Sequence, residues 1–179
     1  MLVFMRCLLL LSGLVVGFAL PLTPGSSLAQ GAGTTAVAQS SDAFNLGSVD
    51  ALLAKGDREA ASGNLTDAVK SYDKARNASR SLLSFYRDLG GAFRGLDARI
   101  PRDMDQKGRE AIEKLAQANL RLAAVYRRQN QSEVAVPLLV EVVKIMTPST
   151  ADGRKAYQQL VEVGFAFTPY AAPAGTATN

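Results

Sequence analysis

The chain has 179 residues, with 20 Lys or Arg against 16 Asp or Glu, one cysteine and no histidine. The commonest general base is absent and the only thiol is Cys7, so we predict a protein that is not an enzyme. The same composition indicates no metal site and no cofactor.

Residues 1–29 have the pattern of a secretory signal peptide. Arg6 supplies a positive charge, an apolar run covers 8–20, and small residues stand on either side of Leu28 at the predicted cleavage site. The alternative is a membrane anchor, because the apolar stretch is nearly long enough to span a bilayer. Cleavage would remove Cys7 and leave an exported domain that disulfides cannot stabilise.

A single folded domain is predicted over 48–168. The preceding residues, 30–47, are small and polar with almost no charge, which is typical of a flexible linker, and 169–179 are expected to form a flexible tail. The first helix of the domain is expected over 49–61, with Ser48 or Asp50 as its cap.

A long second helix is predicted to start near Thr66, since no glycine or proline follows until Gly90 and Gly91. These two glycines are the expected place for a kink or break in it. Pro101 marks the next boundary, because proline lacks the amide donor that a helix interior requires. Three further helices are expected over 103–129, 132–146 and 151–164, the last of them capping the others. No segment is a persuasive strand, so the predicted fold class is all-α.

One spacing pattern occurs twice in the predicted helices. Each copy has a small residue, a polar turn seven residues later and a second small residue five positions further on. The members are Gly56, Gly63 and Ala68 in the first copy, and Ala123, Asn130 and Ala135 in the second. This spacing resembles the tetratricopeptide repeat (TPR), over residues 50–80 and 117–150. The resemblance implies a short stack of antiparallel helical hairpins that binds partners and rarely performs chemistry.

The middle of the chain departs from a regular repeat. The two turns, at Gly63 and Asn130, lie 67 residues apart, whereas two repeats would separate them by about 68. We therefore interpret the middle segment as a divergent or merged repeat. The whole outline also resembles small exported TPR proteins of oxygenic photosynthetic bacteria. That resemblance implies a periplasmic or thylakoid-lumen location, with membrane attachment if the signal is not cleaved.

The family resemblance implies that the first helix of each hairpin lines a concave groove. Carried over by position, the predicted partner-binding residues are Leu53 and Asp57 from the first hairpin, and Leu120, Arg121, Ala124, Arg127 and Arg128 from the second. Arg121 stands where some members of the family bind a peptide carboxylate. The companion positions hold Ala54 and Asp57, so a generic peptide groove is expected instead of a full carboxylate clamp.

Basic residues concentrate in the middle of the chain, where 76–128 contain 12 Lys or Arg against 6 Asp or Glu, a net of +6. On the long helix, Arg80, Arg87 and Arg94 project from one side together with Arg76. This side is either an ordinary solvated face or a docking surface for an acidic protein, since arginine binds carboxylates with two parallel hydrogen bonds. Nucleic acid is not an expected partner, because export would separate the chain from it.

Together these features predict a non-enzymatic protein-interaction module that docks an acidic partner segment. Two alternatives stay open. The apolar stripe from Leu82 to Leu96 could pair two copies into a homodimer. A cavity between the hairpins could instead carry a small apolar ligand.

Overall fold

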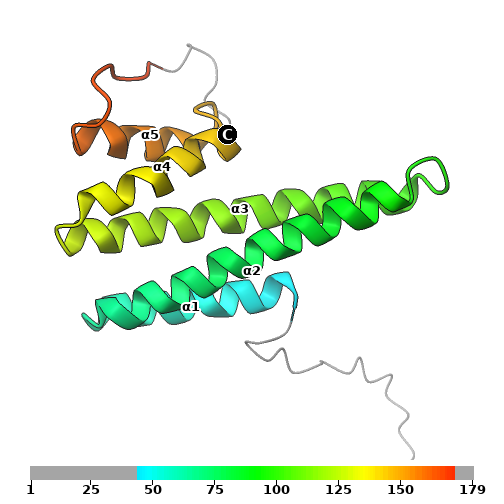
Figure 1. Cartoon of the computed structure of the whole chain (residues 1–179), viewed down its shortest axis with the longest axis horizontal. Helices are drawn as coiled ribbons and strands as arrows, with labels where there is room; N and C mark the ends of the chain where they lie inside the picture. The colour runs from blue at the N-terminus through cyan, green and yellow to red at the C-terminus, as the bar shows by residue number, and fades with distance from the viewer. Residues whose placement is uncertain (1–43, 172–179) are drawn as a thin grey trace, which may run out of the picture. The chain divides into compact units, whose positions relative to one another are not determined.

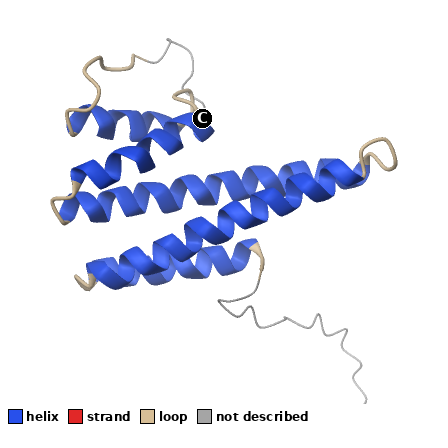
Figure 2. Ribbon diagram, in the orientation of Figure 1, coloured by secondary structure: helices blue, strands red, loops and turns tan. Residues whose placement is uncertain are grey.

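The computed structural model describes residues 44–171, and in that range it contains five helices and no strand. The helices are α1 (Leu46–Ala61), α2 (Leu65–Ala92), α3 (Arg99–Arg128), α4 (Ser132–Met146) and α5 (Ala151–Glu162) (Figure 1 and Figure 2). The predicted all-α class is confirmed. The predicted signal peptide and most of the predicted linker and tail lie outside the described residues.

Each helix packs against the next in the chain, which runs back and forth through the domain (Figure 1). In addition, α1 contacts α3 and α3 contacts α5, whereas the backbones of α2 and α4 do not approach each other. Helices α1, α3 and α5 therefore form an inner row, with α2 and α4 on its outer side. No described helix is both long and apolar enough to cross a membrane.

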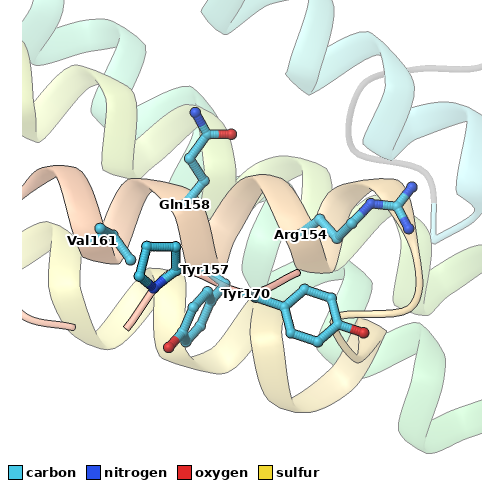
Figure 3. A pocket seen from close by; sticks show the side chains of 6 residues that line it. Arg154, Tyr157, Gln158, Val161 and Tyr170 are labelled. Atoms are coloured by element: carbon cyan, nitrogen blue, oxygen red, sulfur yellow. The ribbon is translucent and has the colours of Figure 1, made fainter. Parts of the chain in front are cut away.

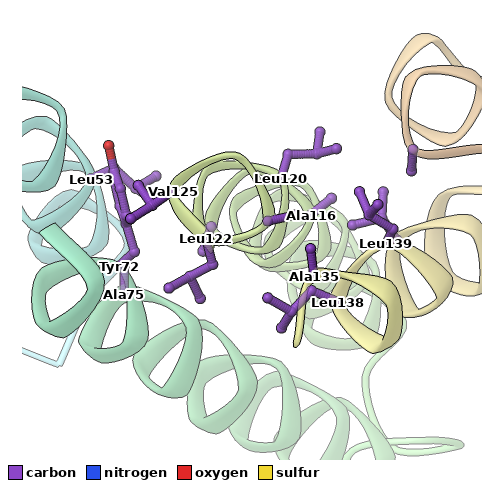
Figure 4. Close-up of a cluster of buried hydrophobic side chains, with 14 of the residues drawn as sticks. Leu53, Tyr72, Ala75, Ala116, Leu120, Leu122, Val125, Ala135, Leu138 and Leu139 are labelled. Atoms are coloured by element: carbon purple, nitrogen blue, oxygen red, sulfur yellow. The ribbon is translucent and has the colours of Figure 1, made fainter. Parts of the chain in front are cut away.

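The hydrophobic core follows α3, which lies between the other helices (Figure 4). Leu122 of α3 and Leu139 of α4 are completely buried. The small residues of the repeated pattern are also buried, as the sequence predicts: Gly56, Ala68, Ala123 and Ala135. At Gly56 a methyl group would lie 2.6 Å from Cδ1 of Tyr72, so only glycine lets α1 and α2 approach this closely.

Helix α1 begins three residues before its predicted start. Its cap is Asn45, whose Oδ1 accepts a hydrogen bond of 2.8 Å from the amide of Ser48. Ser48 is buried within the first turn and is not the cap. Phe44 packs edge-on against Phe85 of α2, with 5.8 Å between the ring centroids. The predicted linker over 30–47 therefore extends too far, because its last residues already belong to the folded domain.

The three inner helices end in the same way. The second residue after each helix has a left-handed backbone, with φ of +83° at Gly63, +59° at Asn130 and +76° at Gly164. The next amide in each case donates to the carbonyl five residues earlier: Asn64 to Glu59, Gln131 to Tyr126 and Phe165 to Leu160, each at 2.9 Å. The last two ends lie 34 residues apart (164 − 130 = 34). Helix α5, predicted as a cap, is thus built like the first helix of a further hairpin.

The middle of the chain forms no separate helical hairpin, which fits the merged alternative of our interpretation and not a divergent repeat. Helices α2 and α3 have 28 and 30 residues, against 16, 15 and 12 for the others. Their distal parts, residues 86–107, pack against each other and project past the remaining helices (Figure 1). We refer to residues 86–107 as the hairpin extension.

Helix α2 passes through both glycines and ends at Ala92, so the predicted break does not occur there. A methyl group at Gly90 would lie 3.1 Å from Cβ of Met104, so the glycine instead allows close packing on α3. Helix α3 starts at Arg99, before the predicted boundary. It accommodates Pro101 in its first turn, where the missing amide has no helical partner.

Candidate partner-binding site

A groove of about 310 Å³ lies between α3 and α5 on the inner row. Of the predicted site residues, the structure brings Leu120, Arg121 and Ala124 together in its α3 wall. Residues of α5 that the sequence analysis did not select form the opposite wall: Asp152, Lys155 and Gln159. The sequence contains a signal for them, since Gly164 follows Asn130 by 34 residues, but the prediction of α5 as a cap leaves this spacing out.

The groove combines an apolar floor with a polar rim. The floor is Leu120, which is 7% exposed, and Ala124 and Lys155 are exposed beside it. The Oε1 atom of Gln159 is buried and has no hydrogen-bond partner within the described residues. Buried acceptors are normally satisfied, so Gln159 is the one groove residue whose side chain has a buried oxygen without a partner in this range.

Arg121 is held in place from α1. Its Nε donates to Oδ1 of Asp57 at 2.9 Å, and the hydroxyl of Tyr72 donates to the same oxygen at 2.7 Å. Partial burial raises the pKa of Asp57, but the hydrogen bonds from Arg121 and Tyr72 outweigh this and hold the pKa below its ordinary value. Burial, reinforced by the Asp57 carboxylate, raises the pKa of Tyr72. Asp57 therefore positions Arg121 on the inner row.

The other predicted groove residues tie the inner helices together. Nη2 of Arg127 lies 3.1 Å from Oε2 of Glu162, which joins α3 to α5. Nη1 of Arg128 donates to the carbonyl of Ala60 at 3.1 Å, which joins α3 to α1. Leu53 is only 3% exposed and belongs to the core, so its predicted place in the groove is wrong. The side of α1 that carries Leu53 is covered by neighbouring helices.

The predicted basic side of α2 divides into two parts. Nη2 of Arg80 donates to both carboxylate oxygens of Glu141 on α4, at 2.6 and 2.7 Å. Arg76 lies 3.5 Å from the same carboxylate, and Nδ2 of buried Asn119 donates to it at 3.0 Å. Arg80 is therefore part of an internal network instead of a free docking residue. Arg87, further along α2, makes no side-chain hydrogen bond or ion pair within residues 44–171, and neither does Arg94 beyond it.

Glu141 was not selected from the sequence. Burial raises its pKa, but hydrogen bonding and charge from Arg80, with Asn119 and Arg76 adding to them, lower it below the ordinary value. The available signal for a role of Glu141 is that it stands as an isolated charged residue in an otherwise apolar run of α4. The partners of Glu141 could not be predicted from the sequence, because they depend on α2 and α4 lying on the same side of the inner row.

A second hollow, of about 410 Å³, lies between α5 and the segment that follows it (Figure 3). The Tyr157 hydroxyl donates to the carbonyl of Thr168 at 2.8 Å, and the Tyr157 and Tyr170 rings meet edge-on at 6.4 Å. Pro169 also lines this hollow. The predicted flexible tail therefore starts too early, because Pro169 and Tyr170 lie against α5.

Within the described range, 44–171, no cluster of acidic, cysteine or histidine side chains is arranged to hold a metal ion. No protein-family model matches the chain, and comparison with curated proteins also finds no match.

Proposed function

We propose that the protein is a non-enzymatic, TPR-like binding module that holds a segment of another protein in the groove between α3 and α5. The observation that carries the proposal is the rigid inner row of helices, with a groove that has an apolar floor and hydrogen-bonding walls. Preorganised helices bind at a lower cost in conformational entropy than flexible loops do.

The chemistry of the groove suits an extended peptide. A single apolar side chain of the partner would pack on Leu120, and its backbone would exchange hydrogen bonds with Gln117 and Gln159. Arg121 has guanidinium donors beyond the Nε that Asp57 occupies, and these suit a carbonyl or carboxylate oxygen of the partner. Lys155 adds a second positive charge, so an acidic residue beside the apolar anchor would strengthen binding.

The two alternatives have less support. Leu82, at the start of the stripe proposed for a homodimer, is 1% exposed and packs inside the subunit, whereas Leu96 at its far end is exposed. The cavity between hairpins that a ligand carrier would use is this same small groove, whose walls are largely polar. Export to a periplasm or thylakoid lumen is part of the proposal and is supported by the residue pattern of 1–29.

The proposal is tested by blocking the groove. Ala124→Arg places a long charged side chain on an exposed position of the groove wall, and Ala51→Arg places the same side chain on an exposed position of α1 outside it. Wild type and both variants are used for crosslinking pull-downs from the exported fraction. A genuine partner is captured by wild type and Ala51→Arg, is lost with Ala124→Arg, and crosslinks to α3 or α5.

Capture of the same proteins by all three forms would contradict the groove as the binding site. Recovery of the protein only from the cytoplasmic fraction, with residues 1–29 intact, would contradict export while leaving the binding proposal to be judged separately. Circular dichroism of each variant confirms that the helices are retained.

A further inference from the structure

Another groove runs along the hairpin extension. Two hollows, of about 390 and 210 Å³, lie next to each other between α2 and α3 and share Asp105 and Arg109 in their walls. This groove lies on a part of the two helices that the other helices do not cover (Figure 1). We call it the arginine groove, because its walls contain Arg87, Arg94, Arg102 and Arg109.

These arginines differ from most others in the domain. Elsewhere, arginine side chains bind a carboxylate, as Arg80 and Arg121 do, or a backbone carbonyl, as Arg128 does. Within residues 44–171, the arginines whose side chains make no hydrogen bond or ion pair are Arg58, Arg87, Arg94, Arg102 and Arg109. All but Arg58 line the arginine groove. The groove holds one carboxylate, Asp105, so its walls carry four positive charges and one negative charge, a net of +3.

The floor of the groove is apolar. Leu83 of α2 faces Gly108 of α3, where a methyl group would lie 3.7 Å from the leucine Cδ1. Met104 and Ile112 are half-buried on either side of this point, and all of these residues line the smaller hollow. A strip of apolar surface is therefore bordered by unpaired guanidinium groups. Its complement is a segment with apolar residues on one side and carboxylates on the other.

We propose that the arginine groove binds an acidic, amphipathic segment of a partner protein, at a site separate from the groove between α3 and α5. Charge complementarity identifies the occupant, since guanidinium groups pair with carboxylates through two parallel hydrogen bonds. An anionic membrane surface fits less well. The apex of the extension carries the exposed Leu96, but Arg99 beside it is neutralised by Asp97 at 2.8 Å, and the free arginines lie around the two hollows.

The test uses a fluorescein-labelled helical peptide with Leu on one face and Glu on the other, titrated against the full-length chain by fluorescence anisotropy. The double variant Arg102→Gln, Arg109→Gln is expected to weaken binding about tenfold, because two charge pairs are lost. Arg58→Gln, which removes a free arginine outside the groove, should leave affinity unchanged. Asp105→Asn should tighten binding about threefold, because it removes the one repulsive charge in the groove.

Several results would overturn the proposal. One is equal binding of a matched peptide with Gln in place of Glu, and another is equal loss in the Arg58→Gln control. Failure of the wild-type chain to bind the acidic peptide would do the same. If the chain binds vesicles containing phosphatidylglycerol but not the peptide, and the double variant abolishes vesicle binding, the groove recognises lipid instead. Ala124→Arg should bind the peptide normally, so this proposal and the proposed function can fail independently.

Discussion

At the scale of single residues, Glu141 decides how the predicted basic side of α2 is used. Its carboxylate accepts hydrogen bonds from Arg80 and Asn119 and lies near Arg76. Helices α2, α3 and α4 therefore meet at one half-buried carboxylate. The spacing of arginines along α2 is visible in the sequence. Which of them face α4 depends on the packing of two helices that are not neighbours in the chain, and no local pattern encodes it.

Glu141→Gln should make stability less dependent on pH. The pKa of Glu141 in the folded protein is below its ordinary value of 4.5. Its stabilisation is therefore complete above pH 4.5 and is lost as the pH falls through the folded-state pKa. We expect the variant to be less stable than wild type by about 1–2 kcal/mol at neutral pH, with the gap closing in acid. Urea unfolding at several pH values measures this.

Glu113→Gln, at an exposed position of α3 without a side-chain partner among residues 44–171, is the control and should show no comparable gap. A gap for Glu141→Gln that stays constant down to strongly acid pH would contradict the role assigned to the ionised carboxylate.

Two glycine-to-alanine changes should shift stability in opposite directions. Gly56→Ala should destabilise the protein by about 1–3 kcal/mol, because its methyl group would overlap the Tyr72 ring. Gly91→Ala has no neighbour within 4 Å, so the higher helix propensity of alanine should stabilise the protein by up to about 1 kcal/mol. Thermal unfolding of both variants distinguishes them, and destabilisation of equal size at both sites would contradict the close packing of α1 on α2.

At the scale of helices, the spacing of residues in the sequence predicts that a helix exists better than it predicts where the helix begins and ends. All five helices were predicted, and the paired small residues at Gly56 and Ala123 are buried as expected. The errors arose where one residue type permits two structures. Pro101 either ends a helix or stands in its first turn, and Gly90 either breaks a helix or lets it pack closely. Only the neighbouring helix determines which occurs.

The left-handed helix ends provide a prediction at this scale. Asn130 has φ of +59°, which asparagine and glycine tolerate better than other residues. Asn130→Ala should therefore cost about 1 kcal/mol, whereas Asn130→Gly should be neutral or stabilising. Thermal unfolding measures both, and an alanine variant as stable as the glycine variant would show that the turn does not depend on this backbone conformation.

At the scale of the whole molecule, the hairpin extension and the inner row each carry one of the two proposed binding sites. The groove between α3 and α5 was partly predictable, because the resemblance supplied the α3 wall at Leu120, Arg121 and Ala124. The α5 wall could have been predicted only by recognising that α5 ends in the same way as α3. The arginine groove was predicted only as a line of charges on α2, since Arg102 and Arg109 come from α3 and complete it only when the two helices lie side by side.

Replacement of residues 86–106 by a short Gly-Ser turn should separate the two functions. The core along α3 lies mainly outside the extension, so unfolding should remain cooperative. Binding of the acidic peptide should be abolished, because three of the four groove arginines are removed, whereas partner capture by the α3–α5 groove should persist. Anisotropy and pull-down measure the two activities, and loss of both in a folded variant would contradict their independence.

The residues that follow α5 leave the helical pattern at the point where another hairpin would continue. Gly164 reverses the chain, Ala166 packs against the core, and Tyr170 lies edge-on against Tyr157. An uncovered final helix could accept the first helix of a second copy, and such head-to-tail contacts generate open filaments when they do not close into a ring. This short segment therefore covers part of the α5 surface that such a contact would need.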